Sequence, residues 1–317
     1  MNDENTEQGS RVQHKTIDAD SAGQRLDNYL LRELKGVPRT RIYRACRKGE
    51  VRINKGRVKP DYRVKAGDVL RIPPIRVPEP SQAPTIARKW SELLTRSVVY
   101  EDKGLLVINK PSGLAVHGGS GLSYGLIECL RQMRPDDRYL ELVHRIDRDT
   151  SGCIMIAKRR PVLREIHRQL REGTVDKRYL ALVAGHWPKQ CRVVDAPLFK
   201  FKLPSGESLV RVAKEGKAAV TRFSIVERFA NATLIEAKPV TGRTHQIRVH
   251  AQHVGFPLLG DDKYSSDEDR EFCKKIGLKR LFLHARFLGV GLPEQGRVEI
   301  DAPLDGNLES ILGKLRN

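Results

Sequence analysis

A chain of 317 residues, of which 39% are hydrophobic, can bury a sizeable core, and its length predicts two domains or one large domain with an appendage. Lysine and arginine number 58 against 39 acidic residues, and this net charge of +19 favours a polyanionic partner such as nucleic acid over a small neutral ligand. The sequence contains no apolar run of the ~18 residues needed to cross a membrane, so we expect a cytoplasmic protein.

The first part of the chain predicts a short arm and a small folded unit. Residues 1–21 are polar and aperiodic, which predicts a disordered arm. Apolar residues recur every four positions in residues 26–34, which predicts a helix, and a second helix is expected between residues 40 and 49. Strand-like alternation with turn residues follows in residues 51–58 and 64–72. Two short helices should therefore lead into a small sheet.

Basic charge is concentrated in this first unit. Residues 22–80 contain 16 lysines and arginines against 6 acidic residues, a net charge of +10. One charged helix face is ordinarily only solvated, but five of the ten residues from Arg39 to Lys48 are basic, and this density predicts an RNA-binding surface. The residues that we expect to contact RNA are Arg39, Arg41, Arg44, Arg47, Lys48, Arg52 and Lys55.

A change of pattern predicts a second, larger domain. The chain becomes proline-rich after residue 72, and residues 81–96 lack sustained periodicity, which suits a semi-rigid linker. Residues 97–317 read as many short strands and a few helices without regular βα alternation. This pattern predicts an α+β domain with a mainly antiparallel mixed sheet flanked by helices. The first unit is then expected to span residues 22–80.

Metal and disulfide chemistry are not expected. The five cysteines are scattered, and no pair has CxxC spacing, which predicts reduced thiols. His245 and His250 are five residues apart and so lie on different faces of a helix, and no HExxH motif accompanies them. We therefore expect no metal and no cofactor.

The stretch HRIDRDTSG, residues 144–152, concentrates charge in a predicted loop between two strands. Asp149 precedes Thr-Ser-Gly, and its carboxylate is expected to accept backbone N–H groups and hold the turn. Asp147 directly follows an apolar strand, where a loop residue is often presented to a cleft, and Arg145 and Arg148 flank it. Asp147 is therefore the better candidate for chemistry, although a surface ion-pair cluster is the commoner role for an aspartate.

Two further segments supply candidate partners. Residues 244–255 predict a helix in which Thr244 is the N-cap and His245, Arg248 and Gln252 share one face, so that Arg248 could reach Asp147. In residues 177–183, Tyr179 alternates with Leu180 and points to the opposite side of a strand. Tyr179 is either an ordinary core residue or a platform for stacking a base.

Four motifs in order resemble the RluA family of pseudouridine synthases. They are KPSG at 110–113, HRIDRDTSG at 144–152, KRYLALV at 177–183 and TGRTHQIRVH at 241–250. The resemblance extends from Gln24 to the C-terminus, and residues 24 to about 74 resemble an S4 RNA-binding domain. One departure is Ile146, where the family commonly has leucine, and both side chains are apolar. The resemblance implies an S4-type α/β domain followed by a pseudouridine synthase domain.

The resemblance also implies an activity and roles for individual residues. The expected reaction is isomerisation of specific uridines of 23S ribosomal RNA, near the peptidyl-transferase region, by a monomer without a cofactor. Asp147 would be the catalytic aspartate, Arg248 its partner, Tyr179 the residue against the target base, and Arg145 a support for the nucleotide outside its helix. Asp147 would either attack C1′ or remove a proton from C2′, and both routes need an ionised carboxylate.

Two other classes of function are compatible with parts of the sequence. The basic first unit alone would suit a non-catalytic RNA-binding or ribosome-assembly factor. A hydrolase could use His144 with Asp147, but the sequence lacks a serine or cysteine in an activating motif.

Overall fold

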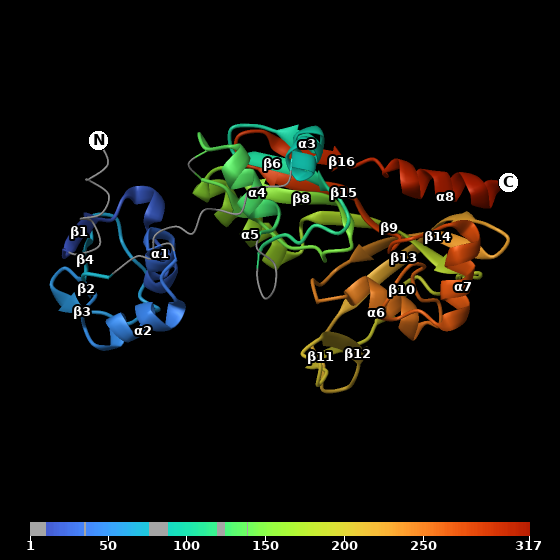
Figure 1. Ribbon diagram of the computed structural model, residues 1–317, viewed down its shortest axis with the longest axis horizontal. Helices are drawn as coiled ribbons and strands as arrows, with labels where there is room; N and C mark the ends of the chain where they lie inside the picture. Colours follow the sequence, from blue (N-terminus) through green and yellow to red (C-terminus); the bar gives the residue numbers. More distant parts are fainter. Residues whose placement is uncertain (1–10, 35, 76–87, 119–123, 138) are drawn as a thin grey trace. The chain divides into compact units, whose positions relative to one another are not determined.

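The computed structural model describes residues 11–34, 36–75, 88–118, 124–137 and 139–317. The chain divides into two compact units, residues 1–85 and 86–317, and each is described by itself (Figure 1). None of the helices in these described ranges is long and apolar enough to span a membrane.

The first unit packs two helices against a small antiparallel sheet with the order β1-β4-β2-β3. Leu26, Leu30, Ile42 and Leu70 are fully buried in its core, so the predicted periodicity does mark the inner faces of both helices. The elements are β1 (Gln13–Thr16), the 3-10 helix η1 (Ala19–Ser21), α1 (Leu26–Glu33), α2 (Arg39–Arg47), β2 (Arg52–Ile53), β3 (Gly56–Arg57) and β4 (Val69–Ile72).

Two predictions at the borders of this unit need correction. Part of the predicted disordered arm is ordered, because β1 pairs with β4 and Ile17 is buried beneath the two strands, while residues 1–10 lie outside the described residues. Part of the predicted linker is helical, because residues 88–96 form α3 (Arg88–Arg96), whose Leu94 is buried in the second unit. Residues 81–87 of that linker also lie outside the described residues.

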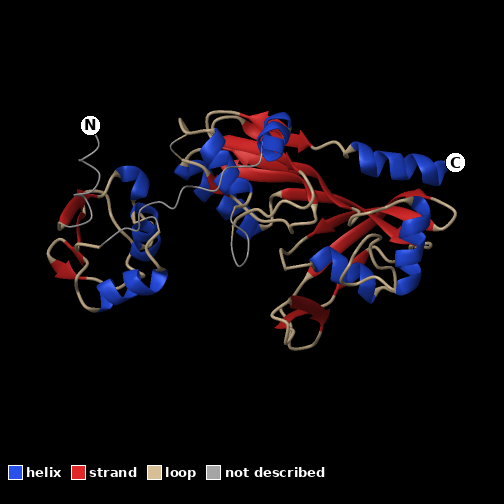
Figure 2. Ribbon diagram, viewed as in Figure 1, coloured by secondary structure: helices blue, strands red, loops and turns tan. Residues whose placement is uncertain are grey.

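The second unit is built on a ten-stranded sheet (Figure 2). Its main path is β10-β13-β14-β9-β15-β8-β6-β5, with β16 paired to β15 and β7 paired to β8. Only the β15–β8 pair is parallel, so the predicted class, α+β with a mainly antiparallel sheet, is confirmed. The strands are β5 (Val98–Glu101), β6 (Leu105–Lys110), β7 (Glu141–Leu142), β8 (Ser151–Ala157), β9 (Asp176–Ala184), β10 (Val193–Asp195), β13 (Val220–Arg228), β14 (Ala232–Pro239), β15 (Leu283–Leu292) and β16 (Gly296–Asp301).

Helices cover both faces of this sheet. Alternate residues of β8 enter different cores: Met155 packs with Ile166 of α5 (Arg160–Glu172), and Ile154 packs with Ile127 of α4 (Leu126–Met133). At the other end, Val183 of β9 packs with α6 (Gln246–His253). Its neighbour Leu182 shares a core with α7 (Asp267–Ile276) and α8 (Gly306–Arg316). Burial on both faces explains why β8 is an unbroken apolar run.

Two local features position the candidate site. Gly152 has φ +106°, and a Cβ there would collide with the backbone of Ala285, so glycine allows β8 to pair closely with β15 directly after the HRIDRDTSG loop. A separate hairpin of β11 (Leu198–Lys202) and β12 (Ser208–Val212) projects from the sheet and packs on α6 through Val210 and Val249 (Figure 1).

Candidate active site

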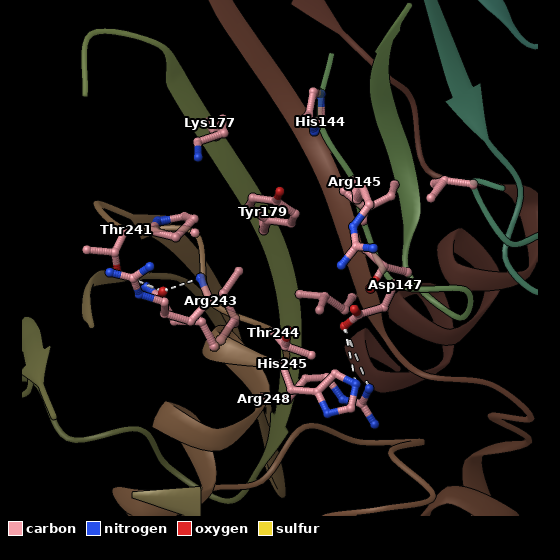
Figure 3. A pocket seen from close by; sticks show the side chains of 18 of the residues that line it. His144, Arg145, Asp147, Lys177, Tyr179, Thr241, Arg243, Thr244, His245 and Arg248 are labelled. Carbon is pink, nitrogen blue, oxygen red and sulfur yellow. Dashed lines mark hydrogen bonds and ion pairs between the residues drawn. The ribbon is translucent and has the colours of Figure 1, made fainter. Parts of the chain in front are cut away.

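A pocket of about 840 Å³ opens in the second unit, a size suited to a nucleotide-sized ligand. Its walls come from segments far apart in the sequence: the HRIDRDTSG loop, β9, and the turn that leads from β14 into α6 (Figure 3). The lining includes Asp147, Tyr179, Arg248 and Arg145, so the structure brings together the four active-site residues singled out from the sequence.

The loop that carries Asp147 is held from beneath by the KPSG segment. Lys110 is fully buried at the end of β6, and its Nζ donates hydrogen bonds to the carbonyls of Pro111, Leu114 and Arg148 at 2.8–2.9 Å. The Ser112 hydroxyl donates to the carbonyl of Asp149 at 2.8 Å. Burial lowers the pKa of Lys110 to about 7, while Asp149 and Asp147 oppose that shift. These bonds fix the backbone on the C-terminal side of Asp147.

The predicted role of Asp149 is therefore wrong. Its carboxylate accepts a hydrogen bond from the Arg148 side chain at 3.1 Å rather than from backbone N–H groups of the turn. The turn is closed instead by the backbone bond from Thr150 N–H to the Asp147 carbonyl and by the anchoring bonds from Lys110 and Ser112. Lys110, which is 38 residues before Arg148 in the sequence, therefore holds the loop in the way that was expected of Asp149.

Arg248 is held in the wall of the pocket by a buried ion pair. Its Nε and Nη2 donate to the two carboxylate oxygens of Asp261 at 2.7 and 2.6 Å, and the two side chains are 4% and 0% exposed. Burial alone would lower the pKa of Arg248, but the hydrogen bonds that Arg248 donates to Asp261 and the negative charge of that carboxylate outweigh it, so the pKa is raised. This bidentate geometry leaves Nη1 of Arg248 for another partner.

That other partner is Asp147. Nη1 of Arg248 lies 3.7 Å from Oδ2 of Asp147, and Nε2 of His245 lies 3.9 Å from the same oxygen (Figure 3). The predicted proximity of Arg248 to Asp147 is thus present, as an ion pair that is longer than a hydrogen bond. The Asp147 side chain is 31% exposed, so it faces the open pocket while its cationic neighbour is almost completely buried.

The helix boundary at this site differs from the prediction. Thr244 does not cap α6; His245 is the N-cap residue, its side chain makes no cap bond, and its backbone is left-handed with φ +54°. This conformation is uncommon outside glycine. It leaves His245 outside the helix, with its imidazole between Asp147 and Tyr264.

Tyr179 and Lys177 line the same pocket from β9 (Figure 3). Burial raises the pKa of Tyr179, which keeps the phenol neutral, and its hydroxyl has no hydrogen-bond partner among the described residues. Lys177 likewise makes no ion pair or hydrogen bond within the described part of the chain, and burial lowers its pKa. Two unpartnered polar groups that face a pocket are available to a ligand.

Arg145 and His144 differ in accessibility. Arg145 is exposed at the pocket, with Nη1 3.3 Å from Nε2 of His117. His144 uses Nε2 to accept a hydrogen bond from the backbone N–H of Met155, and burial lowers its pKa to about 3. Among the described residues no hydrogen bond or ion pair joins His144 to Asp147, so the pair considered for a hydrolase is not formed.

In the first unit, the residues expected to contact RNA fall into two groups. Arg41 forms an ion pair with Glu50 at 3.0 Å, and Arg52 donates to the carbonyls of Gly49 and Lys55. The other residues of the set are exposed, and their side chains make no hydrogen bond or ion pair to any described residue; they are Arg39, Arg44, Arg47, Lys48 and Lys55.

Three residues of the site escaped the sequence reasoning. Asp261 and Tyr264 lie outside the four motifs, and Asp261 is 13 residues from the arginine that it binds, while Lys177 opens the KRYLALV motif but was assigned no role. Within the described residues, no group of three or more histidine, cysteine or acidic side chains could hold a metal ion.

Comparison with known families matches two segments of the chain. Residues 104–253 match the RNA pseudouridylate synthase family, and residues 24–70 match the S4 domain. The first match contains Asp147, Tyr179 and Arg248, and the second contains the exposed arginines of α2.

Similar proteins extend the match to almost the whole chain. The ribosomal large subunit pseudouridine synthase C of Pasteurella multocida is 56% identical over 308 residues, which cover 96% of this chain and 94% of that protein. The protein of the same name from Haemophilus influenzae is 54% identical over 97% of this chain and 96% of that protein. Among solved structures, human RNA pseudouridylate synthase domain containing 4 is similar with a TM-score of 0.59 and 30% identity, over 72% of this chain and 96% of that one.

Proposed function

The chain belongs to the RNA pseudouridylate synthase family, and from this premise we propose that it isomerises specific uridines of 23S ribosomal RNA to pseudouridine, with Asp147 as the catalytic carboxylate. The observation that carries the proposal is the partly exposed carboxylate of Asp147 beside the buried cation of Arg248 in a nucleotide-sized pocket.

The pocket supplies what the reaction requires. The bond from C1′ to N1 of the uridine breaks, the uracil turns, and C5 takes the place of N1 on C1′, so that the proton on C5 is released. Asp147 assists cleavage by attack on C1′ or by removal of the C2′ proton, and Nη1 of Arg248 lies 3.7 Å from the carboxylate that carries out either step. Neither route needs a redox step or a group donor.

The other lining residues bind and orient the nucleotide. A uridine must leave its stack before it can enter the pocket, at a cost of about a few kcal/mol. Tyr179 offers an aromatic face to the uracil, which offsets part of that cost. Arg145 is exposed at the pocket and helps to hold the nucleotide out of its helix.

The first unit adds affinity for RNA. The exposed, unpartnered cations of α2 and of the β2–β3 turn bind RNA phosphates, whereas Arg41 and Arg52, which have protein partners, contribute less. The protein acts as a monomer in the cytoplasm on the large-subunit RNA.

Asp147→Asn tests the proposal. Purified protein is incubated with 23S ribosomal RNA labelled with tritium at uridine C5, and tritium release measures the reaction. We expect release to fall by about 10³-fold or more because an amide can neither attack C1′ nor take a proton, while RNA affinity is unchanged. The matched control is Asp149→Asn, which removes an equal charge two residues away and should change the rate by less than about threefold. Substantial release by Asp147→Asn would disprove the assignment.

A second measurement identifies the substrate sites. Pseudouridines are mapped in ribosomal RNA from cells with and without the gene, and the expected result is loss of several sites near the peptidyl-transferase region. A map that is unchanged in 23S RNA would leave a non-catalytic RNA-binding role as the better explanation.

A further inference from the structure

The β11–β12 hairpin is connected to the candidate site by a hydrogen bond. Val210 of β12 is buried against α6, and its backbone N–H donates to the hydroxyl oxygen of Tyr264 at 3.1 Å. The Tyr264 ring is also fixed from the other side, because the guanidinium of Arg248 lies 5.0 Å from its centre. The position of the Tyr264 hydroxyl is therefore set by the hairpin and by the buried arginine together.

Tyr264 in turn lies against one ring nitrogen of His245, opposite the nitrogen that faces Asp147. Its hydroxyl lies 2.7 Å from Nδ1 of His245. Burial raises the pKa of Tyr264 to about 12, so the phenol keeps its proton, and because its oxygen already accepts the Val210 N–H, the proton is free to be donated to Nδ1. Burial also lowers the pKa of His245, so the imidazole is neutral at pH 7. A neutral imidazole that accepts at Nδ1 carries its hydrogen on Nε2.

The Nε2–H of this tautomer faces the carboxylate of Asp147. Nε2 lies 3.9 Å from Oδ2, and the left-handed backbone of His245 places the ring there, edge-on to Tyr264. The charged groups around the imidazole are Asp147, Arg248, Asp261, Lys263 and Glu207, the last of which is paired with Lys263. A distance of 3.9 Å is too long for a hydrogen bond in the free protein, but such contacts in empty sites commonly shorten when substrate binds.

We propose that His245 is a positioning residue for Asp147: the hairpin fixes Tyr264, Tyr264 fixes the tautomer of His245, and the Nε2–H holds Oδ2 together with Arg248. Oδ1 of Asp147 is thereby left to face the reacting nucleotide. The inference rests on the proposed function, because it assigns His245 a part in the same reaction. The proposed role also accounts for the left-handed backbone of His245, because strained conformations are found mainly at functional sites, where the surrounding structure holds them.

Two substitutions at His245 separate this role from a merely structural one. In His245→Asn, the side-chain amide reaches the position of Nδ1, so the bond to Tyr264 can persist while the donor toward Asp147 is lost. In His245→Gln, the amide nitrogen reaches the position of Nε2, so a donor toward Asp147 can persist while the bond to Tyr264 is lost. Asparagine also tolerates a left-handed backbone better than glutamine does. A structural role therefore predicts that Asn is the milder change, and a positioning role predicts that Gln is.

The readout is the single-turnover rate of tritium release with saturating RNA, together with RNA affinity. We expect His245→Asn to be slower than the wild type by about tenfold and His245→Gln by less than about threefold, with RNA affinity unchanged in both. The matched control is His253→Asn on the exposed side of α6, which should leave the rate unchanged. Equal rates in the two variants, or a slower Gln variant, would overturn the proposal. A wild-type protein that releases no tritium would instead refute the proposed function.

A spectroscopic test does not depend on activity or on either variant folding. In the full chain labelled with nitrogen-15 at histidine, the ring nitrogen shifts distinguish the two neutral tautomers and the cation. We expect His245 to be the Nε2–H tautomer at pH 7 and to lose this preference in Tyr264→Phe, which removes the donor to Nδ1. A wild-type His245 that is protonated on Nδ1 would overturn the proposal.

Discussion

The arginines of α2 and the arginine of α6 carry the same charge in opposite surroundings. The side chains of Arg44 and Arg47 are exposed and make no hydrogen bond or ion pair to any described residue, whereas the Arg248 side chain is 4% exposed and donates two hydrogen bonds to Asp261. Exposed charges act through water over about 8–10 Å and weaken as salt is added. A buried charge is screened much less and has one fixed geometry.

The contrast shows how one abundant residue type serves two purposes. In α2, the number of charges matters more than the position of any one, because attraction to a polyanion is summed over many contacts. At α6, one guanidinium both completes the buried pair with Asp261 and faces Asp147, so its geometry cannot be replaced by another cation nearby. The predictions below test this difference, from the largest expected effect to the smallest.

The largest effect is expected at Arg248. Arg248→Met leaves the Asp261 carboxylate buried without its charged partner, which should lower the free energy of unfolding of the second unit by about 3–5 kcal/mol and slow tritium release by at least about 100-fold. Unfolding in urea is followed by tryptophan fluorescence, because Trp90 and Trp187 both belong to the second unit. The double variant Arg248→Met with Asp261→Asn should regain stability without regaining rate. If the double variant regained the wild-type rate of tritium release, Arg248 would contribute to stability and not to the reaction.

A substitution of Lys110 tests whether this buried lysine holds the local structure, as Arg248 does, or binds RNA, as the exposed lysines are expected to do. Lys110→Met removes the donor to three backbone carbonyls and should lower the free energy of unfolding by about 3 kcal/mol. Tritium release should slow because the Asp147 loop loses its anchor, while RNA affinity is unchanged. The control is Lys103→Met, an exposed lysine in the β5–β6 turn. If Lys110→Met lowered the RNA affinity, Lys110 would contact RNA as the exposed lysines are expected to do, and the prediction would be wrong.

The contribution of the buried His284 to the free energy of unfolding should depend on pH. Its Nε2 lies 2.9 Å from the Ala302 carbonyl and its Nδ1 lies 2.9 Å from the Ser151 hydroxyl, and burial lowers its pKa from 6.5 to about 4. Above pH 6.5, the His284 imidazole is neutral in both the folded and the unfolded chain, so its full contribution to the free energy of unfolding is present. As the pH falls from 6.5 toward 4, the unfolded chain takes up a proton that the folded chain does not, so stability is lost.

We expect the stability of the wild type relative to His284→Gln to shrink by about 2 kcal/mol between pH 7 and pH 4.5. The measurement is again urea unfolding followed by tryptophan fluorescence. A pH-independent difference would mean that the pKa of His284 is the same in the folded and unfolded chains, and would contradict the prediction.

The smallest effect is expected for α2, where each charge is one of many. Arg44→Gln with Arg47→Gln should weaken RNA binding by about tenfold and reduce the slope of log affinity against log salt by about 1.5, because about two phosphate contacts are lost. The rate with saturating RNA should stay the same. The control removes the same charge from arginines that form ion pairs, Arg286→Gln with Arg316→Gln, and should change the slope little. If the control variant changed the slope of log affinity against log salt by the same amount, α2 would bind RNA no more strongly than other arginines of the surface do.

Local features of the molecule were predictable because they depend on neighbours in the sequence. The turn residues predicted within residues 51–58 do form a turn between β2 and β3, with positive φ at Asn54 and Lys55, and the apolar run of residues 153–157 lies in β8, after the loop that carries Asp147. Helix starts were less predictable: α2 begins after Pro38 and α6 begins after His245, because packing rather than a capping side chain sets both ends. The strand β1 was missed because its four residues, Gln13–Thr16, are all polar and so show no apolar alternation in the sequence.

By itself, the sequence determined the fold class, the concentration of basic charge in the first unit, and Asp147 as the candidate carboxylate in a loop after a strand, since composition, periodicity and turn residues are local properties. Only the tertiary structure decided that Asp261 holds Arg248, that Lys110 rather than Asp149 anchors the loop, and that Tyr264 lies behind His245. These contacts join residues from 13 to 38 positions apart, or link the site to a hairpin more than 30 residues away. They form because each buried polar group must find a partner in three dimensions, a requirement that sequence spacing does not encode.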